Sequence, residues 1–206
     1  PPVEIDHFPA TTAQITLRKP NSGEDEQVAL AGPSTVRVLI GPAGEAGDFD
    51  GDGLDQVQTE MTDLSLTGVS SLGAVHVRLN PKQPSYGQIE ERVNVTPGKL
   101  DVPPFAAAGT ADSFFDVFVE IEVGGVVLHP ATPLHMAGVI HHKPPGPGDE
   151  YVNPFTQPVE LLDAAGNRTG IFVVHEVHTP NPINPRPAES DHFPAKAAQT
   201  GGATQK

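Results

Sequence analysis

Apolar residues recur at every second position in many short segments of this chain, and none of these segments keeps a helical period for a dozen residues. Successive side chains of a strand point to opposite faces of a sheet, so a period of two predicts half-buried strands. The clearest segment is Phe114–Val123, which we expect to be one strand. Its apolar face carries Phe115, Val117, Val119, Ile121 and Val123. Gly124-Gly125 and then Val126–His129 follow directly, which predicts a two-residue hairpin.

Other short segments with the same alternation predict further strands, and turn-forming residues separate them. These strands are Ala13–Arg18, Gln27–Leu30, Thr35–Ile40, Gln56–Leu66, Ala74–Leu79, Val139–His142, Val159–Leu162 and Ile171–His178. Asp163–Gly170 is predicted to be a turn, and Gln88–Arg92 a short helical turn. About ten short strands indicate an all-β, antiparallel sandwich or barrel rather than an α/β fold. Of these we favour the β-sandwich, Ig-like or jelly-roll-like.

The two ends of the chain differ from the middle. The length of 206 residues suits one large domain or two small ones. We predict an extended segment over residues 1–12, a sandwich domain over 13–178 and a connector over 179–206. The connector begins with four closely spaced prolines, which favour an extended chain. They are Pro180, Pro182, Pro185 and Pro187.

Composition narrows the classes of function. The chain has 12 Lys+Arg against 26 Asp+Glu, a formal charge of −14, and no basic cluster, which argues against nucleic acid as a partner. No apolar segment approaches the roughly 18 residues of a transmembrane segment. The absence of cysteine excludes thiol catalysis, thiolate metal sites and disulfides. The sequence begins at Pro1 without a methionine, so we expect a secreted, processed protein, extracellular or at the cell surface.

A short sequence near the N-terminus is repeated near the C-terminus. Asp6–Gln14 reads DHFPATTAQ and Asp191–Gln199 reads DHFPAKAAQ, identical at seven of nine positions. The chain is then either one unit of a tandem array or a subunit that joins copies of itself head to tail by donating a strand across a sheet edge. The residues expected to mediate this assembly are Asp6, His7, Phe8, Pro9, Asp191, His192, Phe193 and Pro194.

The most specific chemical motif is the acidic segment Gly47–Met61, GDFDGDGLDQVQTEM. Ca2+ takes six to eight oxygen ligands, and carboxylates at alternate positions of a tight loop converge on one point. Such closely spaced carboxylates would repel one another without a cation. We therefore predict a Ca2+ site that stiffens the scaffold. Its expected ligands are Asp48, Asp50, Asp52, the Leu54 carbonyl, Asp55 and Glu60.

This segment resembles the calcium loops of EF-hands, dockerins and thrombospondin type 3 repeats, which share the DxDxDG opening. The resemblance implies ligands at Asp48, Asp50, Asp52 and the Leu54 carbonyl. The chain departs from the EF-hand pattern at position 12, where Thr59 replaces glutamate and Glu60 comes one residue late. Asp55, Glu60 or a ligand from elsewhere would then complete the site. The chain as a whole resembles uncharacterised secreted bacterial β-sandwich proteins, a resemblance that implies no activity.

No catalytic motif emerges. The sequence lacks HExxH, GxSxG and a phosphate-binding glycine loop. A zinc or copper pocket from scattered histidines stays open as an alternative, and it would use His129, His135, His142 and His175. Our leading hypothesis is a non-enzymatic structural protein, a calcium-stabilised subunit of an extracellular filament or surface assembly. The alternative is a secreted binding module or carbohydrate-active enzyme on the same scaffold.

Overall fold

The computed structural model describes residues 2–154 and 157–181. These residues form twelve strands and no helix. The strands are β1 (Glu4–Arg18), β2 (Asp25–Val38), β3 (Gln56–Ser70), β4 (Gly73–Leu79), β5 (Ser85–Glu91), β6 (Ala111–Val117), β7 (Val119–Val123), β8 (Val126–Pro130), β9 (Leu134–Ile140), β10 (Tyr151–Val152), β11 (Val159–Leu162) and β12 (Arg168–Thr179).

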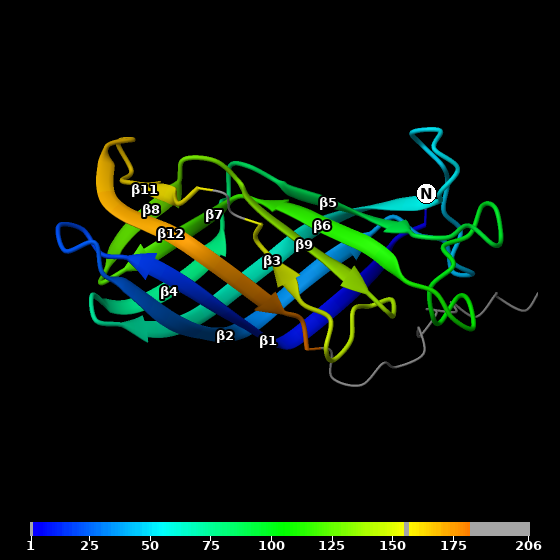
Figure 1. Ribbon diagram of the computed structural model, residues 1–206, viewed down its shortest axis with the longest axis horizontal. Coiled ribbons are helices and arrows are strands. Elements are labelled where there is room, and N and C mark those ends of the chain that lie inside the picture. The colour runs from blue at the N-terminus through cyan, green and yellow to red at the C-terminus, as the bar shows by residue number, and fades with distance from the viewer. Residues whose placement is uncertain (1, 155–156, 182–206) are drawn as a thin grey trace, which may run out of the picture.

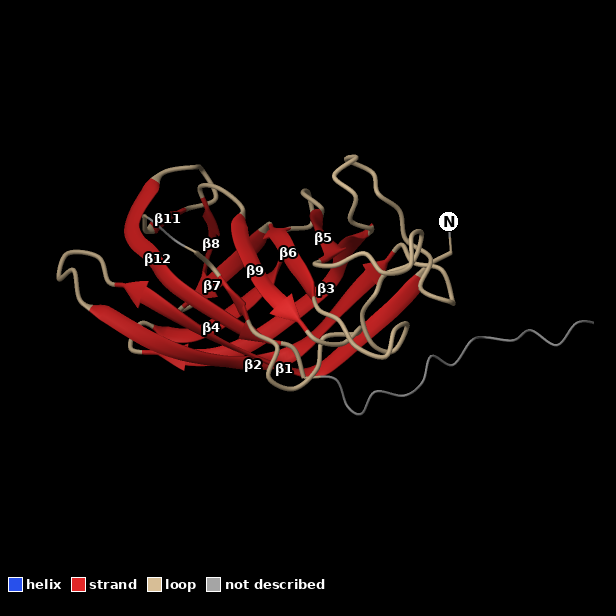
Figure 2. Cartoon of the chain, turned by 45° about the vertical axis from the view of Figure 1, so that its right-hand side comes forward, coloured by secondary structure: helices blue, strands red, loops and turns tan. Residues whose placement is uncertain are grey.

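All strands belong to one antiparallel sheet with the order β1-β2-β3-β4-β7-β8-β11-β12-β10-β9-β6-β5. Two further pairings, β1 with β12 and β3 with β5, close the sheet on itself. The long strands β1 and β2 therefore face β5, β6 and β9 across the interior (Figures 1 and 2). The prediction of an all-β, antiparallel, sandwich-like fold is confirmed.

The predicted alternation explains which side chains fill the interior. In β1, Ala13, Ile15 and Leu17 are buried while the residues between them are more exposed. The inward face of β2 continues the same core. Because each strand buries one face and solvates the other, the register of the whole sheet is fixed by the burial of the apolar set.

The segment Phe114–Val123 differs from its prediction in one respect. It is two strands, because the chain leaves β6 at Val117 and begins β7 at Val119. β6 pairs with β5 and β9, whereas β7 pairs with β4 and β8. At Phe118 the backbone N–H donates to Ser85 Oγ at 3.0 Å instead of to a neighbouring strand. The predicted hairpin at Gly124-Gly125 is present, and both glycines have the positive φ of a primed turn, 58° and 85°.

The predicted helical turn at Gln88–Arg92 is wrong. Most of this segment belongs to β5, which lies between β3 and β6 and pairs with both. Ile89 and Glu91 are buried at alternate positions, as in a strand. Pairing on both edges outweighs the weak local preference of this sequence for a turn.

The N-terminal copy of the repeated sequence lies inside β1, which runs without a break from Glu4 to Arg18. β2 pairs with β1 on both sides of a register shift between Phe8 and Thr11, and β12 pairs with β1 from Thr12 onward. The C-terminal copy, with Asp191, His192, Phe193 and Pro194, lies outside the described residues, as does the connector beyond residue 181.

Candidate functional site: an apolar cavity inside the sheet

A cavity of about 50 Å³ lies between the two walls of the closed sheet. One water occupies about 10–15 Å³ on a comparable measure, so the cavity is larger than a single solvent site. Its walls are mostly apolar side chains from the inward faces of the strands. Prominent among them are Val36, Met61, Phe115, Val117, Leu134 and Met136. The chain has two methionines, and both line this cavity.

A few polar side chains also line the cavity, and three of them, Asp6, Ser34 and Tyr151, have hydrogen-bond partners in the protein. Ser34 Oγ lies 2.8 Å from Thr11 Oγ1, and the Tyr151 hydroxyl donates to Ser113 Oγ at 2.9 Å. Burial raises the pKa of Tyr151, so its hydroxyl keeps its proton. These groups are satisfied within the fold, and no ligand is needed to complete them.

Two other polar groups of the cavity are buried and have no hydrogen-bond partner among the described residues. They are Thr59 Oγ1 of β3 and Glu176 Oε2 of β12. Gly87 of β5 lies opposite Thr59, and a Cβ at Gly87 would clash with the Phe114 carbonyl oxygen and come within 2.8 Å of Thr59 Oγ1. Glycine at this position therefore keeps the space beside the Thr59 hydroxyl open.

Glu176 is the most unusual group of the site. It lies opposite Ile15 in the β1–β12 pairing and is 9% exposed. Burial raises the pKa of Glu176 to about 7, since the protein replaces the water that would solvate the carboxylate. Two residues further along β12, burial lowers the pKa of His178 to about 4, which keeps that imidazole neutral at neutral pH.

Asn153 is the neighbour of Glu176 on the adjacent chain segment. The register that pairs Val152 with Val177 continues to these two residues, and the Asn153 N–H donates to the Glu176 carbonyl oxygen at 3.1 Å. Asn153 is 4% exposed, and its Nδ2 has no hydrogen-bond partner in the part of the chain that the structure describes. An unpartnered donor and an unpartnered acceptor thus come from residues that oppose each other in one pairing.

A buried lysine pairs with Asp6, one of the carboxyl groups that line the cavity. Lys143, in the loop between β9 and β10, has a fully buried side chain whose Nζ donates to Asp6 Oδ1 at 2.9 Å and to Glu4 Oε1 at 3.0 Å. Burial raises the pKa of Asp6 to about 6, although the charge of Lys143 acts in the opposite direction. Asp6 and Phe8 of the repeated sequence both line the cavity, so they serve the interior of their own molecule. His7 and Pro9 face outward.

Part of the predicted calcium loop comes together in the structure. Asp48, Asp50 and Asp52 are exposed, and each offers a carboxylate oxygen within 4.8 Å of the others. Asp48 also holds the loop, accepting hydrogen bonds from the N–H groups of Gly51 at 2.7 Å and Gly53 at 3.0 Å. The carboxylates of Asp50 and Asp52 join burial in raising the pKa of Glu90, a β5 residue that sequence reasoning did not assign to the loop.

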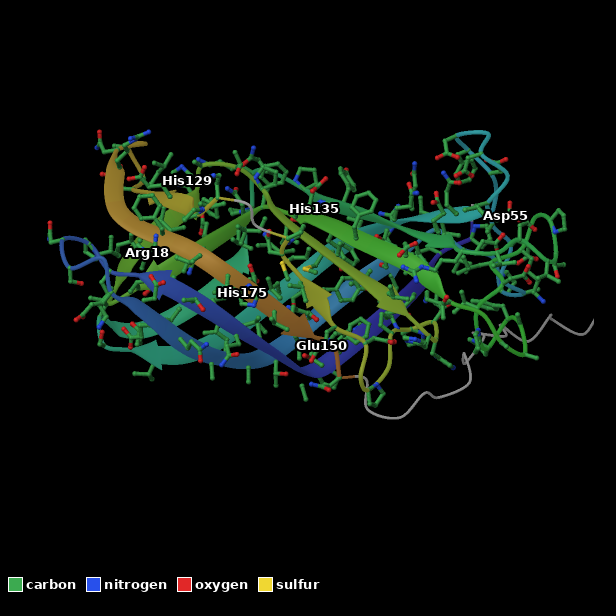
Figure 3. The ribbon with its side chains drawn as sticks, viewed as in Figure 1. Arg18, Asp55, His129, His135, Glu150 and His175 are labelled. Carbon is green, nitrogen blue, oxygen red and sulfur yellow. The ribbon has the colours of Figure 1, made fainter. Side chains whose placement is uncertain are left out.

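The other predicted ligands have different surroundings. Leu54 donates its N–H to Asp52 Oδ1 at 2.9 Å. Asp55, labelled in Figure 3, is 3% exposed and accepts hydrogen bonds from the N–H groups of Gly98 at 2.6 Å and Lys99 at 3.2 Å. Glu60 pairs with Arg37 at 3.2 Å across the β2–β3 pairing. The structure therefore does not bring Asp55 and Glu60 into the aspartate cluster.

The histidines do not form a common site. His129, His135 and His175 come from β8, β9 and β12 (Figure 3). His135 Nδ1 lies 2.8 Å from Asp116 Oδ1, and its ring stacks on Phe114. Among the described residues, the aspartate cluster is the one group of three or more possible ligands that comes close enough to share a metal ion. A His pocket for zinc or copper is thus not formed there.

Sequence reasoning missed the cavity. Alternation predicts that Phe115 and Val117 point inward, but it gives no sign that the opposing walls leave a space between them. A glutamate within a strand also looks like a solvated residue, and Glu176 carries no local signal of its burial.

No family model and no curated protein matches this chain. Among solved structures, it is similar to DynF from the dynemicin biosynthesis pathway of Micromonospora chersina, with a TM-score of 0.65 and 20% sequence identity. The match covers 90% of this chain and 83% of DynF, and it shows that the two share a fold. Among the described residues, no helix has the length and hydropathy needed to cross a membrane.

Proposed function

We propose that this protein binds a small apolar molecule in the cavity enclosed by its sheet. The observation that carries the proposal is the coincidence of an apolar cavity with two unpartnered polar groups, Thr59 Oγ1 and Glu176 Oε2. Ligand sites typically combine predominantly apolar walls with a few polar groups that orient the ligand.

Two general properties of folded proteins support a binding site over a packing defect. Interiors are close-packed with few voids, and buried polar atoms are nearly always hydrogen-bonded. In this protein a void and two unpartnered buried polar atoms occur at the same place. A bound molecule would fill the space and supply the missing partners.

The two methionines suit this role. Met61 of β3 and Met136 of β9 come from different strands, and both line the cavity. Methionine has three rotatable bonds and adapts to irregular spaces, so its rearrangement would admit a ligand larger than the space in the ligand-free protein. This proposal belongs to the binding-module alternative raised from the sequence. A sugar fits less well, because its many hydroxyls would meet few polar partners.

The proposal predicts that filling the cavity abolishes binding. Toluene, measured by isothermal calorimetry, should bind the wild-type protein and lose at least tenfold in affinity when Val36→Ile and Val117→Ile add two methylenes to the walls. The matched control is Val28→Ile with Val77→Ile, which enlarges two buried valines that do not line the cavity. Toluene that does not bind the wild-type protein, or that binds both double variants equally, would contradict the proposal.

A second candidate function is the binding of Ca2+ by Asp48, Asp50 and Asp52. The observation that favours it is the convergence of three carboxylates within 4.8 Å on one exposed loop. Hard divalent cations prefer such oxygen ligands. The negative charges of Asp50 and Asp52 also help to raise the pKa of Glu90 in β5, and a bound cation would offset them. The ion would stabilise the loop by binding the folded state and not the unfolded chain.

Assembly into an extracellular filament stays a prediction. The N-terminal copy of the repeat offers His7 and Pro9 to a neighbour, because Asp6 and Phe8 are buried. Deleting residues 191–206 would separate the two ideas. Ligand binding in the cavity should survive the deletion, whereas head-to-tail polymers seen by electron microscopy should disappear.

A further inference from the structure

We infer that the ligand presents a hydroxyl group to Glu176, so that the cavity accepts apolar alcohols or phenols and rejects apolar carboxylates of the same size. This inference rests on the proposed function and adds the chemical class of the ligand to it. It follows from the hydrogen-bonding needs and the charges of the buried groups.

When Glu176 is ionised, its unpartnered carboxylate oxygen needs a hydrogen-bond donor. Glu176 Oε2 is buried beside an apolar space and receives no hydrogen bond from the described residues. A buried acceptor without a donor loses its hydration and gains nothing in return. A purely apolar ligand would fill the cavity but leave this acceptor unsatisfied.

A hydroxyl group meets the need of Glu176, the residue of the Asn153–Glu176 pair that lines the cavity. A hydroxyl donates one hydrogen bond, and Glu176 Oε2 is able to accept it. A carboxylate ligand only accepts and would leave the ionised Glu176 without a donor.

The charges around the cavity also disfavour an anionic ligand. Of the described residues that line it, Asp6 and Glu176 carry carboxyl groups and none is a lysine or arginine. The nearby Lys143 ammonium is already shared between Asp6 and Glu4. An apolar carboxylate would therefore bury a second negative charge beside Glu176 without a cation to balance it.

Three probes with the same ring test the inference. Toluene, benzyl alcohol and benzoate differ in the single group that would reach Glu176. At pH 8.5, above the raised pKa of Glu176, the wild-type protein should bind toluene and benzyl alcohol, and benzoate should bind at least tenfold more weakly than benzyl alcohol. Calorimetry on the full chain measures all three.

Two variants of Glu176 make the test specific. Glu176→Met keeps a similar volume without a hydrogen-bonding group. It should weaken the affinity for benzyl alcohol roughly tenfold relative to the affinity for toluene. Glu176→Gln keeps a donor and an acceptor but removes the charge. Its affinity for benzyl alcohol should stay within about threefold of that of the wild-type protein, and its affinity for benzoate should rise. Neither variant breaks a hydrogen bond to Glu176 Oε2 among the described residues, because that oxygen has none there.

The outcomes separate the inference from the proposal beneath it. If wild type binds toluene but Glu176→Met leaves the ratio of benzyl alcohol to toluene affinity unchanged, a buried water serves Glu176 and the inference is overturned. Equal binding of benzoate and benzyl alcohol by wild type would overturn it as well. If neither toluene nor benzyl alcohol binds, the proposed function itself fails.

Discussion

Burial shifts the pKa values of Glu176 and His178 in opposite directions. The pKa of Glu176 rises from 4.5 to about 7, so the folded state holds a proton that the unfolded chain releases. The pKa of His178 falls from 6.5 to about 4, so the folded state excludes a proton that the unfolded chain takes up. Glu176 therefore destabilises the fold as the pH rises from 4.5 through 7. His178 destabilises it as the pH falls from 6.5 through 4.

We expect Glu176→Gln to flatten the alkaline side of the stability profile. The free energy of unfolding of the variant should exceed that of wild type above pH 7, by an amount on the order of 3 kcal/mol, and the two should converge near pH 4. Urea unfolding at intervals between pH 4 and 8.5 measures this difference. Parallel profiles for the two proteins would show that the Glu176 carboxyl titrates in the fold as it does in water.

Lys143→Met should be strongly destabilising. The substitution leaves the Asp6 carboxylate buried beside Glu4 without its cation, and breaking a buried pair in this way costs about 3–5 kcal/mol. Adding Asp6→Asn should restore part of the loss, because the remaining buried charge is removed. Lys82→Met, at an exposed lysine, is the control and should change the free energy of unfolding by less than about 0.5 kcal/mol. A Lys143→Met protein as stable as this control would refute the structural role of the pair.

At the scale of elements, the acidic loop divides into a cation-facing part and a buried part. Asp50 is exposed in the aspartate cluster, whereas Asp55 accepts backbone hydrogen bonds from Gly98 and Lys99. The two residues are five positions apart, and sequence reasoning gave both the same role. Their burial separates them, and burial depends on the loop that packs beside Asp55.

This division predicts different responses to calcium. Asp50→Asn should melt at the same temperature in calcium and in chelator, while wild type should melt several degrees lower in chelator. Asp55→Asn should lower the melting temperature in both conditions yet keep the difference between them. Asp63→Asn, at an exposed aspartate of β3, should behave as wild type. If the chelator does not change the melting temperature of the wild-type protein, the aspartate cluster is only a solvated acidic turn and the calcium site is refuted.

The sequence predicts well those elements that are determined by neighbouring residues in the chain. The Gly124-Gly125 hairpin follows from turn chemistry, and the burial of Phe115 and Val117 follows from alternation. The break at Phe118 has no comparable signal, since apolar alternation continues across it. The chain changes partners there because β6 and β7 belong to different parts of the closed sheet.

At the scale of the whole molecule, function depends on closure of the sheet. β1 pairs with β12, which brings Thr12 opposite Thr179, and β3 pairs with β5 as well as with β4. These contacts between distant parts of the chain enclose the cavity and bury Glu176. Sequence periodicity assigns faces to strands, but it contains no information on which strands close the sheet. The fold class was therefore predictable, whereas the cavity needed the three-dimensional arrangement.

The two methionines allow a direct test of the central claim. The protein labelled with 13C at the methionine methyl groups should give one NMR signal from each of Met61 and Met136, and both side chains line the cavity. Titration with toluene should shift both signals together and to saturation in the wild-type protein. It should shift neither in the Val36→Ile, Val117→Ile double variant. Methionine signals that stay fixed while toluene binds, or that shift equally in the filled variant, would contradict binding inside the sheet.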